Sequence, residues 1–198
     1  MAKITYSAKF DNVTSDLPRI NKVIAADMNE IKDSVNALYD SIGGWVDYED
    51  SATSATPINL TQNVWTDLTN DKAGSGTITT YKPSFITGDL WNSASNSLDF
   101  TEVGSGRIMI VRNDFDITAG AANTRIDARL YFPDTAKSIE FMHDNIASNN
   151  DLVRYSRTTQ LFTFTDVLTS GCKIQVRADK SGATATVENF LITLISHF

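Results

Sequence analysis

The chain of 198 residues predicts a mostly β protein, in which a jelly-roll β-sandwich head follows a short α-helical coiled coil. The helix is indicated by apolar residues that recur in steps of three and four between residues 17 and 42. The head is indicated by about ten short segments with β-prone composition, separated by Gly, Asn and Ser turns. The pair Gly43-Gly44 separates the two regions, because glycine ends a helix sharply.

The helical stripe follows a coiled-coil heptad from residue 28 onward. Apolar side chains fill successive a and d positions: Met28, Ile31, Val35, Leu38 and Ile42. Isoleucine at a d position, as at Ile31, disfavours a parallel dimer and favours three or four strands. We therefore predict that these five residues form the interface of a homotrimeric stalk spanning 17–44.

An alternative to this stalk and the position of the helix start both stay open. The stripe is shorter than four heptads, so a single amphipathic helix packed on its own domain would show the same period. Two successive steps of four, from Ile20 through Ile24 to Met28, are a stutter if the helix begins at Leu17 and a helix break if it begins at Ala25. The dense polar residues outside the seam leave a narrow apolar strip, which favours the coiled coil.

Residues 1–16 alternate weakly between polar and apolar types and end in the helix-capping run Thr14-Ser15-Asp16. Because this segment precedes a stalk, we expect an N-terminal anchoring arm. A frayed terminus without a role is the alternative.

The head domain is expected over 45–198, as a series of short strands. We predict them at 45–48, 58–60, 64–69, 77–82, 97–101, 106–117, 124–133, 138–143, 152–165, 172–179 and 184–196. Residues 51–56, rich in Ser, Ala and Thr, are expected to be a loose connection.

Two of these strands alternate cleanly between an apolar and a polar face, which predicts one buried and one wet side. The polar face of the first carries Arg125, Asp127, Arg129 and Tyr131, and that of the second carries Lys173, Gln175, Arg177 and Asp179. Cys172 lies on the apolar face of the second strand and is expected to act as a small hydrophobic residue.

The final strand, 184–196, is apolar on both faces. Its side chains form two opposed rows, one of Phe190, Ile192 and Leu194 and the other of Val187, Leu191 and Ile195. A sandwich strand needs only one apolar face for its own core, so the second face predicts cover by another chain. We assign Phe190, Ile192 and Leu194 to the trimer interface.

Composition excludes several classes of partner. The net charge is −7, and the Lys and Arg residues form no basic cluster, so we expect no nucleic-acid binding. No apolar run approaches the length of a membrane span, and the first residues lack the apolar core of a secretion signal. A single cysteine cannot staple the fold, which is consistent with synthesis in a reducing cytoplasm.

The residues that usually carry chemistry are too few or too scattered, and we expect no enzyme, cofactor or metal site. His143 and His197 with one cysteine cannot form a zinc site. Asp114 and Asp116 lie two apart on a predicted strand, so they share a face that suits calcium or a glycosidase pair, or is simply solvated. The loop Asn149-Asn150-Asp151 is interpreted in the same way.

Three tryptophans, Trp45, Trp65 and Trp91, are compatible with a platform that stacks on sugar rings. Core or interface positions are the more common role of tryptophan.

The helical segment from Ile24 to Ile31, continuing to Val35-Asn36, resembles the "T-A-A-D-x-N-E-I…V-N" opening of tailed-phage fibre and head-appendage proteins. In that family the motif begins a short trimeric helix. The chain departs from the pattern at Ile24, which stands in the region where the family has a helix-capping threonine and its neighbours.

The head resembles the trimeric jelly roll of the tumour-necrosis-factor and complement type that occurs in phage structural proteins. The matching stretches are 57–60, 65–71, 90–92, 98–100, 106–115 and 185–196. The resemblance implies a non-enzymatic virion component, a homotrimeric fibre or capsid decoration protein. It would attach to capsid or tail proteins through residues 1–16, and its heads would contact host-surface glycans. The alternatives are a secreted or cell-surface carbohydrate-binding or signalling module and, third, a glycan-degrading enzyme.

Overall fold

The computed structural model describes residues 25–41, 43–163 and 171–195, and these fall into two units that we treat separately. The first is helix α1 (Ala25–Ser41), and the second is a β domain that begins at Gly43. The expected arm at 1–16 and the alternative helix start at 17–24 lie outside the described residues. So do Ile42 and the side chain of Leu38, both of which belong to the predicted seam.

Helix α1 confirms that the apolar stripe is helical over its described part, which is 17 residues long. Alanine, leucine, glutamate and lysine favour this conformation, and no proline interrupts it. The coiled coil itself stays a prediction, because it requires further copies of the chain.

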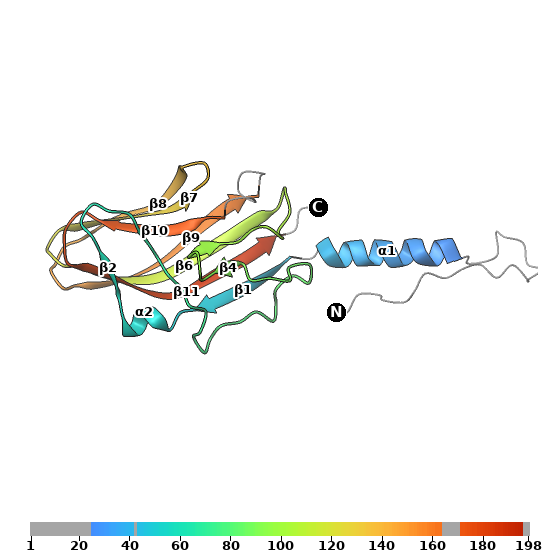
Figure 1. The fold of residues 1–198 in the computed structure, drawn as a ribbon, viewed down its shortest axis with the longest axis horizontal. Helices are drawn as coiled ribbons and strands as arrows, with labels where there is room; N and C mark the ends of the chain where they lie inside the picture. Colours follow the sequence, from blue (N-terminus) through green and yellow to red (C-terminus); the bar gives the residue numbers. More distant parts are fainter. Residues whose placement is uncertain (1–24, 42, 164–170, 196–198) are drawn as a thin grey trace, which may run out of the picture. The chain divides into compact units, whose positions relative to one another are not determined.

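The β domain is a sandwich of two antiparallel sheets (Figure 1). Sheet A consists of β1 (Gly44–Glu49), β11 (Ala183–Ile195), β6 (Ile108–Thr118) and β9 (Leu152–Phe162), in that order, and β2 (Ile58–Leu60) pairs with β11. Sheet B consists of β3 (Thr66–Asp67), β10 (Lys173–Ala178), β7 (Thr124–Phe132) and β8 (Lys137–Ile146). A small ribbon of β4 (Trp91–Asn92) and β5 (Ser97–Leu98) and a one-turn helix, α2 (Ala52–Ala55), complete it.

The order of the strands is that of a jelly roll. The hairpin β7–β8 lies in sheet B, while the strands that precede and follow it, β6 and β9, pair with each other in sheet A. The next two strands repeat the crossing, since β10 joins β7 and β11 joins β6. Such nested pairs, split between two sheets, are the double Greek key of this architecture. The predicted fold of the head is therefore confirmed.

The core lies between the sheets. On β6, alternate residues from Met109 to Ile117 are fully buried, and the residues between them are only partly buried. The same period of two holds on β7, where Ile126, Ala128 and Leu130 are fully buried. Each sheet therefore has an inner face that is buried in the core and an outer face that solvent can reach.

The final strand corrects one of our predictions. Phe190 and Ile192 are completely buried within the single chain, and the ring of Phe190 meets Trp91 edge-on at a centroid distance of 4.8 Å. Leu194 is 2% exposed. This row is enclosed by its own protomer, so placing it at a trimer interface is wrong. The row on the outer face of sheet A is Leu191, Thr193 and Ile195.

A β-bulge explains the rest of the burial pattern of β11. The register with β6 shifts between Val187 and Asn189, so Glu188 is an extra residue in the ladder. Val187 and Phe190, three residues apart, therefore both point into the core. Simple alternation placed these two residues on opposite faces.

The strand expected at 77–82 does not form a ladder. Its backbone meets β1 through hydrogen bonds at Ile78 and Tyr81, whose carbonyl oxygens accept from the N–H groups of Asp47 and Trp45. A step of two positions on β1, from Trp45 to Asp47, thus corresponds to a step of three on this segment, from Tyr81 back to Ile78, so regular pairing is lost. Residues 51–56, expected to be loose, include α2, and the side chain of Asp50 accepts hydrogen bonds from the backbone and hydroxyl of Thr53 there.

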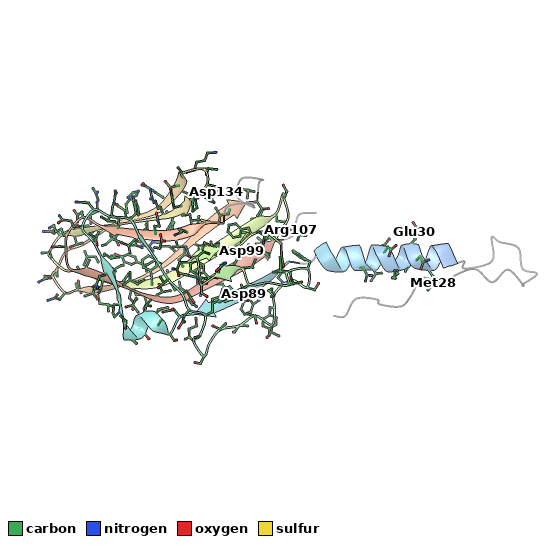
Figure 2. The ribbon with its side chains drawn as sticks, in the orientation of Figure 1. Met28, Glu30, Asp89, Asp99, Arg107 and Asp134 are labelled. Atoms are coloured by element: carbon green, nitrogen blue, oxygen red, sulfur yellow. The ribbon has the colours of Figure 1, made fainter. Side chains whose placement is uncertain are left out.

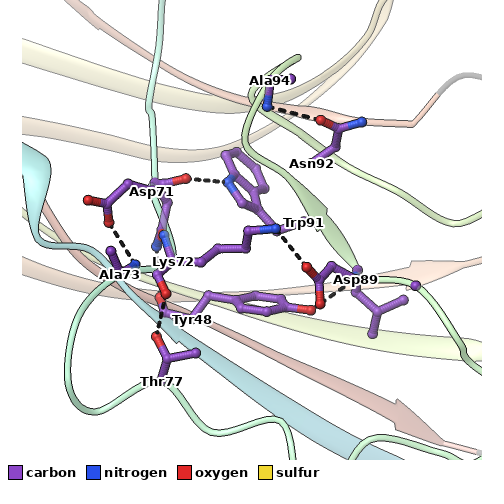
Figure 3. Close-up of polar contacts among 12 residues, drawn as sticks. Tyr48, Asp71, Lys72, Ala73, Thr77, Asp89, Trp91, Asn92 and Ala94 are labelled. Carbon is purple, nitrogen blue, oxygen red and sulfur yellow. Dashed lines mark hydrogen bonds and ion pairs between the residues drawn. The ribbon is translucent and has the colours of Figure 1, made fainter.

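Polar contacts fix the long connection between β3 and β4 against β1 (Figure 3). The indole N–H of Trp91 donates to the carbonyl oxygen of Asn70 at 2.8 Å, and the ammonium of Lys72 contacts Asp89 at 2.7 Å. The hydroxyl of Tyr48 accepts from the N–H of Leu90 at 2.9 Å. These bonds satisfy the polar atoms that accompany two large buried rings, as buried polar groups require.

Asp71 is the acid-sensitive part of this connection. Burial alone would raise the pKa of its carboxyl, but hydrogen bonds from the N–H groups of Ala73 and Ser51 and from the Ser51 hydroxyl outweigh it and lower the pKa to about 2. The unfolded chain binds a proton at this carboxyl near pH 4, so the native state loses this stabilisation as the pH falls from about 4 towards 2.

We expect Asp71→Asn to flatten the decline of stability across that window, as measured by urea unfolding at a series of pH values. Asp134→Asn, in the exposed turn between β7 and β8, is the matched control and should keep the wild-type slope. An unchanged slope for Asp71→Asn would show that this carboxyl does not contribute.

Candidate functional site

The predicted seam on α1 is exposed where its side chains are described. Met28 is 40% exposed, Ile31 53% and Val35 45%. Met28 and Glu30 leave the helix on different sides (Figure 2), so an apolar and a polar face are both presented. The three apolar side chains are therefore substantially exposed in the single chain.

The outer face of sheet A carries a second apolar surface, which we call the apolar corner: Ile108, Ile110, Phe162, Leu191 and Ile195. Ile108 lies directly between Ile195 on β11 and Phe162 on β9, so one row across three strands is wholly apolar. Ile195 is 40% exposed and Phe162 51%. Monomeric proteins rarely leave contiguous apolar rows of this kind in water.

Further along the same face the surface becomes acidic. A groove of about 590 Å³ is lined by residues of β1, α2, β6 and β11 and of the connection between β1 and α2: Glu49, Asp50, Ser54, Asp114, Asp116, Thr186, Val187, Glu188 and Asn189. Burial is the main cause that raises the pKa of the nearby Asp47, and the charge of Arg112 offsets it only in part.

Asp114 and Asp116 share the outer face of β6, as their spacing predicted. Each has an arginine of its own: Arg112 Nε lies 2.9 Å from Asp114, and Arg154 Nε lies 3.0 Å from Asp116. Paired in this way, the two carboxylates are held by protein cations. No three His, Cys, Asp or Glu side chains among the described residues gather closely enough to hold a metal ion.

The outer face of sheet B has a different chemistry, built on aromatic rings and guanidinium groups. Trp65, just before β3, lies over two arginines, with ring-to-guanidinium distances of 4.2 Å to Arg129 and 4.5 Å to Arg177. Arg129 also lies 4.7 Å from the ring of Tyr131. Each such contact is worth about 0.5–2 kcal/mol, depending on how far it is desolvated. We call Trp65, Arg129, Tyr131, Gln175 and Arg177 the arginine–aromatic cluster.

Asp127 organises the neighbouring part of this face. It is 2% exposed and accepts hydrogen bonds from Arg177 at 2.6 Å and from His143 at 2.8 Å. Burial alone would raise the pKa of Asp127, but these bonds and the charge of Arg125 outweigh it and lower the pKa. The strands β7, β8 and β10 are thereby tied together at one point.

The structure separates the three tryptophans expected to form a platform. Trp91 is fully buried, Trp45 is partly buried and stacks on Tyr81 at 4.8 Å, and Trp65 lies on sheet B. A shared sugar platform of all three is excluded, because Trp91 serves the core. Trp65 is the one of the three that lies over two cationic side chains among the residues that the structure describes, Arg129 and Arg177.

The remaining candidates have structural roles. Asn150 takes a positive φ of 58° in the turn before β9, and its N–H donates to the carbonyl oxygen of Ala119. Cys172 is completely buried, as its apolar face predicted, and burial raises the pKa of its thiol. In the described part of the chain, no helix is both long and apolar enough to cross a membrane. His197 lies outside the described residues.

No protein-family model matches the chain, and no curated protein matches it. Solved structures with a similar arrangement include murine APRIL (9% identity, TM-score 0.40), PRD1 vertex protein P5 (12%, 0.39) and the xylan-binding module CBM15 (13%, 0.33). The similarity covers 77%, 79% and 79% of this chain and 98%, 96% and 97% of those chains. At these identities and TM-scores the comparisons assign no function.

Proposed function

We propose that this chain is a non-enzymatic structural protein of a phage particle, a homotrimeric fibre or capsid decoration protein. Residues 1–16 attach it to the capsid or tail, the helices associate as a short stalk, and the jelly-roll heads project. The observation that carries the trimer is the exposed apolar seam on α1. The assignment to a virion rests on the resemblance of residues 24–36 and of the head to phage appendage proteins.

The seam supports association because it gives the helix an apolar face that can pack against other chains. Helix α1 spans 17 residues, and most helical stability in proteins comes from packing an apolar face rather than from intrinsic propensity. Met28, Ile31 and Val35 provide such a face at a and d positions. Burying it against two further copies gives the helix the packing that it needs.

The outer face of sheet A supports the same assembly from the head. The apolar corner would lose its contact with water against a second copy. A neighbouring chain would supply apolar cover here.

Light scattering of the purified full-length chain tests the trimer. We expect a mass three times the chain mass of 21.8 kDa. Ile31→Asp and Ile108→Asp should each shift the mass towards one chain, because a carboxylate would be desolvated in the interface without a partner. Ser34→Asp, outside the seam, and Thr118→Asp, at the far end of the same face of β6, are the matched controls.

A wild-type chain with the mass of one protomer would refute the trimer. If Ile108→Asp leaves the trimer intact, the apolar corner is not part of the interface. Electron microscopy of intact particles with labelled antibody tests the virion assignment, and label at capsid or tail is the expected result. Particles that carry no label would contradict it.

A further inference from the structure

We propose that the arginine–aromatic cluster on the outer face of sheet B binds the carboxylate group of an acidic sugar, with Arg129 as the residue that holds the carboxylate. The site lies within a single protomer. It therefore goes beyond the trimer proposed above and does not depend on it.

Arg129 differs from Arg125, Arg177 and Lys173 on this face because these three form ion pairs with carboxylates. Arg125 and Arg177 contact Asp127 at 3.4 and 2.6 Å, and Lys173 contacts Asp67. Among the residues that the structure describes, Arg129 makes no ion pair. Burial is the main cause that lowers the pKa of its guanidinium; the charges of Glu140, its cross-strand neighbour, and of Asp67 act in the opposite direction without making an ion pair.

The hydrogen bonds of Arg129 leave one side of its planar group unused. Its Nε donates to the side-chain oxygen of Gln175 at 2.9 Å. Gln175 is 7% exposed, and its amide nitrogen donates to Asp67 at 2.7 Å, which fixes the direction of the amide. No described residue accepts a hydrogen bond from either terminal nitrogen of Arg129, although both carry donors.

The aromatic rings restrict what can reach these nitrogens. Trp65 and Tyr131 lie within 5 Å of the guanidinium carbon and hold it in place, so an acceptor must approach in the plane of the group. A planar carboxylate matches that plane with two parallel hydrogen bonds. An incoming ligand would also touch the exposed parts of both rings.

A sugar acid fits this combination better than a bare anion or a flexible acidic peptide. Its pyranose ring offers flat C–H surfaces that pack against aromatic side chains, while the carboxylate is fixed rigidly to the ring. Inorganic phosphate has no apolar surface to gain from Trp65 and Tyr131. A peptide carboxylate would lose side-chain freedom on binding.

Calorimetric titration of the full-length chain tests the site. Tetragalacturonate is the probe, and the neutral galactose tetrasaccharide, with a hydroxymethyl group in place of each carboxylate, is its matched control. We expect the acidic sugar to bind with a millimolar or lower Kd and the neutral one at least about tenfold more weakly, because a lost charge-assisted pair leaves Arg129 unpaired.

Variants locate the interaction. Arg129→Gln should weaken tetragalacturonate binding by about tenfold or more, and Arg129→Lys should weaken it similarly, because lysine keeps the charge but loses the planar fork. Arg154→Gln, which removes an exposed arginine from the opposite sheet, should leave the affinity unchanged. If Arg129→Gln fails to fold, Arg129→Lys and the comparison of the two sugars decide.

Several results would overturn the proposal. They are the absence of millimolar binding by the acidic sugar, equal binding of the neutral sugar, and equal loss in Arg154→Gln. Binding of inorganic phosphate or tetraglutamate as tight as that of tetragalacturonate would reassign the cluster to anions in general or to acidic peptides, and would also refute it.

Discussion

Replacing Phe190 with alanine is expected to lower the free energy of unfolding by about 3–5 kcal/mol, which is the usual cost of truncating a buried phenylalanine. The ring is completely buried and packs edge-on against Trp91, so its loss leaves a cavity at the centre of the sandwich. Urea unfolding followed by fluorescence measures the change. The effect should be independent of protein concentration, because the ring packs within one protomer.

Leu191→Ala is the matched comparison, since the neighbouring side chain lies on the outer face of the same strand. We expect its effect to fall mainly on the concentration-dependent part of stability, because that face is available to other copies. If Leu191→Ala destabilised the protein as much as Phe190→Ala at every concentration, the assignment of the inner and outer rows of β11 would be wrong.

Gly120→Ala is expected to destabilise the protein by about 3 kcal/mol or more, because the added methyl group would overlap backbone atoms. Gly120 lies in the connection between β6 and β7. A Cβ there would come within 2.2 Å of the carbonyl carbon of Gly182 and 2.4 Å of the oxygen of Ser181. The turn before β11 would have to move away from the turn after β6.

Gly88→Ala is the matched control for this substitution. A Cβ at Gly88 would meet only the carboxylate of Glu102, at 3.8 Å, which is ordinary contact. We expect its melting temperature to stay close to that of the wild type, whereas Gly120→Ala should melt several degrees lower. Equal melting temperatures for the two variants would contradict the close approach of the two turns.

The strands with one polar and one apolar face were predictable from sequence, because the period of two assigns each side chain to a face. On β7 the apolar row of Ile126, Ala128 and Leu130 is buried as predicted. Turn residues also marked the ends of most strands to within a few positions. The jelly-roll order followed from the resemblance and from the number of strands.

The face of β11 that forms the core could not be predicted in the same way. Both rows of this strand are apolar, so periodicity identifies two rows without telling which one is inside. The bulge at Glu188 then moves Val187 to the inner row, and nothing in the local composition announces it. Only the packing against Trp91 and β6 decides between the two faces.

The arginine–aromatic cluster was missed for a different reason. The wet faces of β7 and β10 were identified, and these contain Arg129, Gln175 and Arg177. However, Trp65 lies more than sixty positions before Arg129 in the sequence. It joins the cluster because β3, which follows it, pairs with β10 in the same sheet. Local spacing along the chain cannot reveal a site whose parts come from separate strands.

The burial of Cys172 gives this molecule a built-in reporter of its own opening. The thiol is the only one in the chain, and it lies fully enclosed beside β5 with its pKa raised, so a thiol-reactive dye cannot label the closed protein. Labelling must wait until this part of the sandwich separates. At dye concentrations where labelling outpaces reclosing, the rate of dye uptake therefore measures how often this part of the sandwich opens, without any engineered cysteine.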